Sequence, residues 1–508
     1  MRRIAALLFV LVAGSARAQE PRFDVALAAR VFAAGLDFIA PRSLDPVTVA
    51  DLAGWGLHGI PALDPAFTAG IVNGQVQLSD PKGIIYARLA PPDGNGPATS
   101  AAWGEAVAAL AGAASLASAP VRSAGTQGVI QSVFDEMFNH LDPYSRYVAP
   151  VAAEEDRARR SGEAGAGLAL ERDRSGIVIR SVNADGSGAA AGLRAGDHVL
   201  AVDGQPTRNQ DVATVADWIS GDEGTVVELL VRDVHGRVRQ VAAERAVTPP
   251  ETVFASRVGD VLLLRVAFFA EDTDLRVSTE LAQAVHGRRP VRGAILDLRD
   301  NHGGLLRQAV AASELMLGGG VVVTTAGRDP QASHVWEADS PDLLAGRPIV
   351  VLVDGRSASA AEIMAAALAD RGRAVVTGSA TYGKGLVQAV TTLPDGGELF
   401  VSWSRLLAPD GWPLQGLGVL PQVCTSLGEA SLHEQLDALS AGRDLLGPAL
   451  ARARAARPPL PEAQAVELRN ACPAAIGGDE DLGAARWLLA HSAAYGAALL
   501  PGAMRASP

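Results

Sequence analysis

The stretch VLVDGRSASAAEIMAAALADRGRAVVTGSATYGKGLVQ, residues 351–388, decides the fold class. An apolar strand leads to Ser359 and an alanine-rich helix, and a second apolar strand, RAVVTGS, follows that helix. Between residues 251 and 423 further strands alternate with helices over short connections, which predicts an α/β layer fold. The fully apolar strand IVVLV, residues 349–353, indicates a sheet that is covered on both faces.

Ser359 stands at the junction between the strand and the helix of this stretch. A hydroxyl group there is well placed as a nucleophile, because the free N–H groups of the first helical turn can bind a developing oxyanion. Serine is also a common N-cap, and an N-cap needs no catalytic role. Ser359 alone therefore leaves a nucleophile and a structural cap as alternatives.

Lys384 lies between two glycines in the sequence TYGKG. Desolvation of an ammonium group favours its neutral form, and a neutral amine can act as the general base for a serine. The alternative is an exposed loop lysine. The surrounding sequence GSATYGKG resembles a phosphate-binding loop, but Gly385 occupies the position of the hydroxyl residue that binds Mg²⁺. Nucleotide binding is therefore not expected.

A second glycine pair, Gly303 and Gly304, follows the buried strand of LDLRDNHGGL and precedes a helix. Glycines at such a position let backbone N–H groups approach a ligand closely, although a plain tight turn has the same pattern. The neighbouring His302 is a weaker candidate for a base. The helix that contains His433 begins like a zinc-protease motif but lacks the second histidine, so no metal site is expected.

Short alternating strands between residues 165 and 247 predict a β-rich module. The module begins with a loop directly ahead of a strand. Amides in such a loop can hold the C-terminal carboxylate of a peptide that adds a strand to the sheet, and the alternative is a module without a ligand. The candidate carboxylate-binding residues are Gly165, Ala166, Gly167 and Leu168.

The N-terminus has the pattern of an export signal: two arginines, an apolar run over residues 4–14 and small residues before a predicted cleavage after Ala18. A short buried helix and an uncleaved anchor are the alternatives. No later segment is apolar enough to span a bilayer, so a soluble mature protein is expected. In an exported chain Cys424 and Cys472 can form a disulfide, and two buried thiols are the alternative.

The whole chain has 508 residues, a net charge of −12 and 48% hydrophobic residues. The hydrophobic content predicts several packed domains, and the acidic charge argues against a nucleic-acid-binding protein, which needs a basic face.

Taken together, the motifs resemble the carboxyl-terminal processing proteases, or tail-specific proteases, of the Ser/Lys peptidase family S41. The matching stretches occur in the order of that family and cover residues 125–423. They are LDPYSRYV (141–148), GLRAGDHVLAVDGQP (192–206), ILDLRDNHGGLL (295–306), SASAAEIMAAALADRGRAVVTGSATYGKGLVQ (357–388) and LLAPDGWPLQGLGVLPQV (406–423).

The resemblance implies a multidomain α/β protein with a crotonase-like catalytic core and an inserted β-rich PDZ domain. A helical N-terminal region and a helical C-terminal tail complete the expected organisation. The expected boundaries are 1–18 for the signal peptide, 19–125 for the mostly helical N-terminal region, 126–162 for a helical segment and linker, 163–248 for the PDZ domain, 249–423 for the protease core and 424–508 for the alanine-rich tail.

The resemblance also assigns roles to residues. Ser359 is the expected nucleophile, Lys384 the general base and Gln388 the residue that orients the lysine. The backbone N–H groups of Ala360 and of Gly303 or Gly304 would form the oxyanion hole. This chain has His302 where the family usually has proline and Ala361 where it usually has serine, and neither departure removes a catalytic group.

The expected function is therefore that of a serine endopeptidase, periplasmic or secreted, that cleaves exported proteins near their C-termini without a metal or cofactor. Its expected partners are protein or peptide substrates, bound through their C-termini, and no nucleic acid. An adapter protein and a homo-oligomer are left open. A non-catalytic PDZ adapter is the alternative function, but it would be expected to lack one of Ser359, Lys384 and Gln388. A crotonase-type enzyme acting on thioesters is disfavoured by the PDZ-like module.

Overall fold

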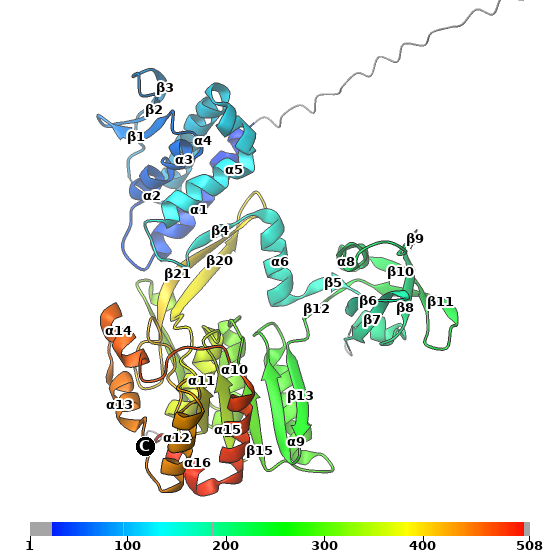
Figure 1. The fold of residues 1–508 in the computed structure, drawn as a ribbon. Coiled ribbons are helices and arrows are strands. Elements are labelled where there is room, and N and C mark those ends of the chain that lie inside the picture. Colours follow the sequence, from blue (N-terminus) through cyan, green and yellow to red (C-terminus); the bar gives the residue numbers. More distant parts are fainter. Residues whose placement is uncertain (1–22, 95, 184–185, 502–508) are drawn as a thin grey trace, which may run out of the picture. The chain divides into compact units, whose positions relative to one another are not determined.

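The computed structural model describes residues 23–94, 96–183 and 186–501, so the predicted signal peptide lies outside the described residues. The chain divides into two compact units, the first within residues 1–149 and 390–400 and the second within 150–389 and 401–508 (Figure 1). None of the described helices is long and apolar enough to cross a lipid bilayer.

The first unit combines helices with a small antiparallel sheet in the order β1-β2-β3. Helix α1 packs against α4, and apolar residues between 129 and 138 are buried on the second half of α5. The elements are α1 (Val25–Arg42), α2 (Val49–Gly56), α3 (Gly59–Leu63), β1 (Thr68–Val72), β2 (Gln75–Ser79), β3 (Ile85–Leu89), α4 (Pro97–Ala117), α5 (Ala119–Phe138) and β4 (Arg146–Val148).

The β-rich module of the second unit follows helix α6. Its main sheet has the order β11-β10-β8-β7-β6, so β6 is an edge strand, and β5 pairs separately with β12. The elements are α6 (Pro150–Ser161), β5 (Glu163–Gly165), β6 (Leu168–Asp173), β7 (Gly176–Val182), α7 (Ser187–Ala190), β8 (His198–Val202), β9 (Gln205–Pro206), α8 (Val212–Ile219), β10 (Val226–Arg232), β11 (Val238–Glu244) and β12 (Ala246–Thr248).

The α/β core of the second unit is built on a sheet with the order β13-β14-β15-β18-β19-β22. Its strands are parallel except β13, which runs antiparallel to β14. The elements are β13 (Val253–Val258), β14 (Val261–Val266), α9 (Thr273–His286), β15 (Gly293–Asp297), α10 (Leu306–Leu317), β18 (Ile349–Val353), α11 (Ala360–Asp370), β19 (Ala374–Gly378) and β22 (Val423–Cys424).

A second sheet has the order β17-β16-β21-β20, and β4 also pairs with β21. Strand β21 pairs with β4 through residues 398–400 and with β16 through residues 404–407. The elements are β16 (Gly320–Gly327), a 3₁₀ turn (Pro330–Ala332), β17 (His334–Ala338), β20 (Leu386–Thr392) and β21 (Glu398–Leu407).

Helices cover both faces of the core sheet, as the apolar strand β18 predicted. On one face Ile349, Val351 and Val353 pack with apolar residues of α9, α10 and α11. On the other face Val350 and Leu352 pack with apolar residues of α12 (Glu429–Ser440), α15 (Asp479–Ala490) and α16 (Ser492–Ala498). The alternating side chains of one strand therefore anchor two separate helical layers.

The helices after residue 424 supply the second of these layers. The sequence predicted helices here without a packing partner, and the structure shows that three of them bury one face of the sheet. The elements are α12 (Glu429–Ser440), α13 (Gly447–Ala455), α14 (Glu462–Arg469), α15 (Asp479–Ala490) and α16 (Ser492–Ala498).

Candidate active site

Ser359 lies at the turn between β18 and α11, where it is the N-cap residue of the helix. Its backbone has φ of 56° and ψ of −113°, a conformation that residues with a side chain rarely adopt. Such conformations cost free energy and are concentrated at functional sites. The N–H group of Ala360, in the first turn of α11, donates to no acceptor among the residues that the structure describes.

Glu362 accepts hydrogen bonds from both segments that carry the predicted catalytic residues. Its Oε2 atom accepts the backbone N–H groups of Ser359 at 2.7 Å and of Lys384 at 2.9 Å. Its Oε1 atom accepts the hydroxyl of Thr381 at 2.5 Å and the N–H of Gly383 at 2.7 Å. The side chain is fully buried. Burial raises the pKa of Glu362, and the four hydrogen bonds act against that shift.

Lys384 lies shortly before β20, which begins at Leu386, and Gln388 lies within the first residues of that strand. The Nζ atom of Lys384 donates a hydrogen bond to Oε1 of Gln388 at 3.2 Å, and both side chains are only partly buried. The structure therefore brings together the pair that the resemblance assigned as general base and orienting residue. The N–H of Tyr382 donates to the carbonyl of Ser357 at 2.9 Å, a second direct link between the lysine and serine segments.

Gly385, which follows Lys384, is a glycine for a steric reason. A side chain at Gly385 would place its Cβ atom 2.0 Å from the backbone nitrogen of Gln415. The N–H of Gly385 donates to Oε1 of the same glutamine at 2.9 Å. The segment around residue 415 therefore forms a wall against which the lysine loop is fixed.

The loop that contains Gly303 and Gly304 lies beside Ser359. A Cβ atom at Gly303 would approach Cβ of Ser359 to 2.8 Å, so only glycine fits there. The N–H of Gly303 donates to Oδ1 of Asn301 at 2.8 Å. Within the described residues no hydrogen bond is made by the N–H of Gly304, which leaves it as the free donor of the pair. Asn301 is buried, and its Nδ2 atom holds the loop to the carbonyl of Val266 at 2.7 Å.

His302 lies on this loop but projects into a solvated environment. Its side chain is 69% exposed, and its Nε2 atom lies 3.4 Å from Oδ1 of Asp300. Asp300 also pairs with Arg356 at 3.2 Å. An exposed imidazole with this partner has no contact that would make it the base for Ser359.

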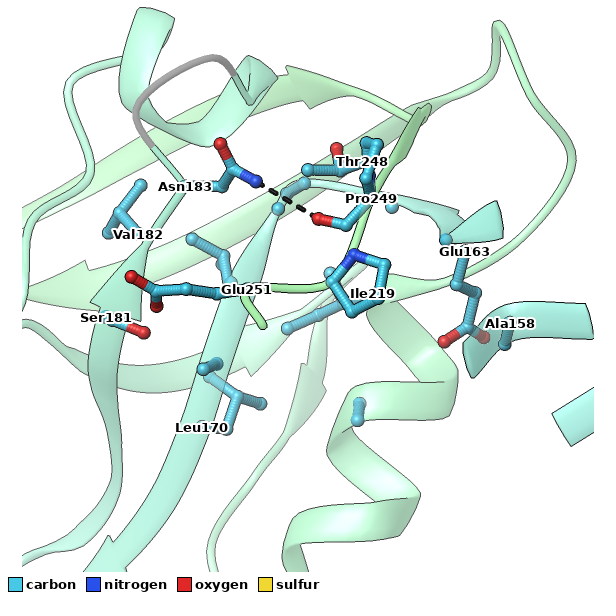
Figure 2. A pocket seen from close by; sticks show the side chains of 18 of the residues that line it. Ala158, Glu163, Leu170, Ser181, Val182, Asn183, Ile219, Thr248, Pro249 and Glu251 are labelled. Atoms are coloured by element: carbon cyan, nitrogen blue, oxygen red, sulfur yellow. Dashed lines mark hydrogen bonds between the residues drawn. The ribbon is translucent and has the colours of Figure 1, made fainter. Parts of the chain in front are cut away.

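The predicted carboxylate-binding loop, residues 165–168, borders a pocket of about 610 Å³ beside the edge strand β6. Figure 2 shows Leu170, Ile219 and Glu251 among the side chains around it, with the 3.3 Å hydrogen bond from Nδ2 of Asn183 to the carbonyl of Pro249. An edge strand beside a pocket lined in part by apolar side chains, here Leu170 and Ile219, is an arrangement that accepts an extended peptide.

Cys424 and Cys472 form a disulfide, with their Cα atoms 5.7 Å apart. Cys424 ends β22, where it pairs with Gly378 of the neighbouring strand β19. The bridge therefore joins the segment before α15 to the edge of the core sheet.

Sequence reasoning gave no role to Glu362 or Thr381. One signal was present, because Ser359 and Glu362 have the S-x-x-E spacing of a capping box. That pattern predicts the hydrogen bond to the N–H of Ser359 but not the bonds to the lysine loop, which come from a segment about twenty residues further along the chain. Thr381 carries no local signal.

Comparison with known proteins identifies the family of the chain. The sequence model of peptidase family S41 matches residues 260–425, and a PDZ domain model matches residues 178–233. The carboxy-terminal-processing protease of Bartonella bacilliformis is 33% identical over 302 residues, which cover 58% of this chain and 69% of that protein. The carboxyl-terminal-processing protease of Picosynechococcus sp. is 33% identical over 288 residues, which cover 55% and 69%.

A more distant relative is the chloroplastic carboxyl-terminal-processing peptidase 3 of Arabidopsis thaliana, 30% identical over 306 residues. The match covers 56% of this chain and 58% of the plant protein, less than two thirds of its length. Among solved structures, the photosystem II D1 C-terminal processing protease is 25% identical, with coverage of 74% of this chain and 92% of that chain and a TM-score of 0.36. The chain belongs to the carboxy-terminal-processing proteases of peptidase family S41, a family of serine peptidases.

Proposed function

We propose that the chain is an endopeptidase with a Ser/Lys site, in which Ser359 is the nucleophile, Lys384 the general base and Gln388 the residue that orients the amine. One observation carries this proposal. A single buried carboxylate, that of Glu362, accepts the backbone N–H groups of both Ser359 and Lys384, so the two segments are held in a fixed relation.

The chemistry follows from these positions. The neutral amine of Lys384 takes the proton of the Ser359 hydroxyl while the oxygen of Ser359 attacks the peptide carbonyl carbon. The oxyanion is bound by the N–H of Ala360 and by an N–H of the Gly303–Gly304 pair, of which Gly303 would first have to leave Asn301. The ammonium then gives its proton to the leaving amine, and water hydrolyses the acyl-enzyme with the same lysine as base. No step requires a metal or cofactor.

The proposed substrates are exported proteins whose C-termini bind to the PDZ domain as an added strand beside β6. We assign residues 163–248 to that domain and residues 249–423 to a crotonase-like protease core. The proposed site of action is the periplasm or the exterior of the cell, after removal of the signal at residues 1–18. Mass spectrometry of the mature N-terminus tests this last point, and a chain that begins before Gln19 contradicts the proposed cleavage.

The test of the activity compares the mature protein with its Ser359→Ala and Lys384→Met variants on unfolded exported proteins, with the new C-termini read by mass spectrometry. Methionine keeps much of the lysine stem and removes only the amine. We expect each variant to lose activity by ~10³-fold or more, and the double variant to be hardly worse because the two groups act as a unit. A wild-type protein that binds these substrates and leaves them intact would instead be a PDZ adapter.

A further inference from the structure

The segment formed by residues 469–481, named here the C-terminal clasp, contacts the serine loop, the start of the lysine loop and the strand end that leads into the glycine loop. It lies beyond residue 425, where the match to the peptidase family ends. The clasp runs from the end of α14 through Cys472 to the first turn of α15.

The clasp first holds the serine loop. The carbonyl of Ala475 accepts the N–H of Gly355 at 2.8 Å, and the N–H of Gly477 donates to Oδ2 of Asp354 at 3.2 Å. The other oxygen of Asp354 accepts the N–H of Ser357 at 3.0 Å. One buried carboxylate thus joins the clasp to the turn that leads to the nucleophile.

The clasp also holds the lysine loop. The hydroxyl of Ser379 donates to the carbonyl of Ala475 at 2.9 Å and accepts the N–H of the same residue at 3.0 Å. Arg469 donates from Nη1 to the carbonyl of Leu417 at 2.7 Å. Burial lowers the pKa of Arg469, and the charge of Glu362 opposes that shift.

A third contact reaches the strand end that leads into the glycine loop. Arg299 binds both oxygens of Asp297, at 2.8 and 2.7 Å. Its Nη1 atom donates to the carbonyl of Gly478 at 2.6 Å and to Oδ2 of Asp481 at 3.2 Å. The clasp therefore fixes the segment immediately ahead of Asn301.

The clasp is fastened at two places. Near one end, Cys472 is bonded to Cys424 at the edge of the core sheet. At the other end, α15 is packed on the second face of that sheet. Without the disulfide, the stretch from Cys472 to α15 would be attached to the core only through its hydrogen bonds and the Arg299–Asp481 ion pair.

We propose that the clasp positions the catalytic loops and that the Cys424–Cys472 disulfide is required for it to do so, which makes turnover dependent on oxidation. This inference rests on the proposed function. A dithiol reagent would break the S–S bond and supply two electrons and two protons, giving two thiols and the oxidised, cyclic disulfide of the reagent. The reduced chain would still bind peptides, because the β-rich module contributes nothing to the clasp.

The test measures kcat and KM for a quenched fluorescent peptide with an apolar C-terminus. It compares the oxidised protein, protein reduced with dithiothreitol whose two free thiols have been counted, and the Cys424→Ser/Cys472→Ser double variant. We expect kcat to fall at least tenfold in the last two samples, with KM changed less than twofold and peptide binding unchanged. We also expect a shift of the pH at which kcat reaches half its plateau, because the surroundings of Lys384 change.

A second arm leaves the disulfide intact. Ser379→Ala removes both hydrogen bonds to Ala475, whereas the control Ser313→Ala removes a bond from an equally buried hydroxyl to Ala309 within α10. We expect Ser379→Ala to lower kcat at least fivefold and Ser313→Ala to leave it within twofold, at similar losses of thermal stability.

The outcomes separate the two proposals. Reduced protein with unchanged kcat and pH profile overturns the role of the clasp while the proposed function stands. Oxidised wild-type protein that cleaves nothing, and so does not differ from Ser359→Ala, overturns the proposed function and the catalytic role of the clasp together.

Discussion

Glu362 shows how one buried side chain can set the geometry of two catalytic segments. It has four donors for its two oxygens, and three of those donors are backbone N–H groups. Backbone donors cannot rotate away, so the carboxylate defines where the serine and lysine segments meet. This makes Glu362 a positioning residue, because it touches the backbone of the proposed catalytic residues and not the reacting atoms.

Glu362→Gln is expected to impair turnover and stability together. The amide can accept at one atom only, so whichever way it turns, two of the four donors lose their acceptor. Buried donors without acceptors cost about 1–3 kcal/mol each, so two of them predict a loss of about 2–6 kcal/mol in the free energy of unfolding. Urea unfolding and kcat measure both effects. Glu434→Gln, at an exposed position, is the matched control. Equal kcat and equal stability of the two variants would show that the Glu362 carboxylate does not position the catalytic segments.

The proposed base predicts the direction of the pH dependence. Activity should rise with pH as the ammonium of Lys384 loses its proton, and should level off once the amine is neutral.

The titration of this amine can be followed by NMR. Lysine occurs at only one other position, the exposed Lys82, so the lysine signals of isotope-labelled protein can be assigned with Lys82→Arg. His302→Ala should keep the profile and most of the rate. An inactive His302→Ala beside an active Lys384→Met would replace the Ser/Lys mechanism with a Ser/His one.

The resemblance of the motifs to the peptidase family allowed roles to be proposed for Ser359, Lys384 and Gln388. Glu362 lies in one of the same motifs, but its role depends on a loop that approaches it only in the folded chain. The sequence also could not show which glycine of the pair supplies the free N–H group. Whether Gly303 or Gly304 has a free N–H depends on the position of Asn301, which no spacing encodes.

Among the elements, the helices that follow residue 424 are those whose packing the sequence predicted least well. Their helical character was predictable from composition and spacing, but their partner was not. The strands of the core sheet are apolar along their whole length, which indicates cover on both faces without saying which helices supply it. The structure assigns that task to α12, α15 and α16.

Leu488→Ala in α15 tests this layer. Leu488 is fully buried against the second face of the sheet, and such truncations cost about 2–5 kcal/mol because they leave a cavity. The control is Leu427→Ala, whose side chain is 42% exposed and should cost less than about 1 kcal/mol. Denaturant unfolding followed by circular dichroism compares the two. Similar small losses would mean that α15 contributes little to the core.

For the whole molecule, the question is how the PDZ pocket serves the peptidase. If it reads a free carboxylate, a peptide with an apolar C-terminal residue should bind at least tenfold more tightly than its amidated form, because the amide brings no charge to the loop amides. Isothermal titration with the Ser359→Ala protein measures this without cleavage. Ile219→Asp should weaken both peptides by placing a charge in the apolar part of the pocket. Equal affinities for acid and amide would remove the carboxylate-reading role.

The helices of the second layer are synthesised last, and this affects how the chain folds in the cell. A chain leaves the ribosome with its N-terminal part first, so the strands of the core sheet emerge before the helices that cover their second face. Val350 and Leu352 therefore stay exposed to water until α15 and α16 arrive. A message that ends early would release a chain with a bare apolar sheet, which is prone to aggregate. Folding of the catalytic core is thus expected to follow the end of synthesis, not to accompany it.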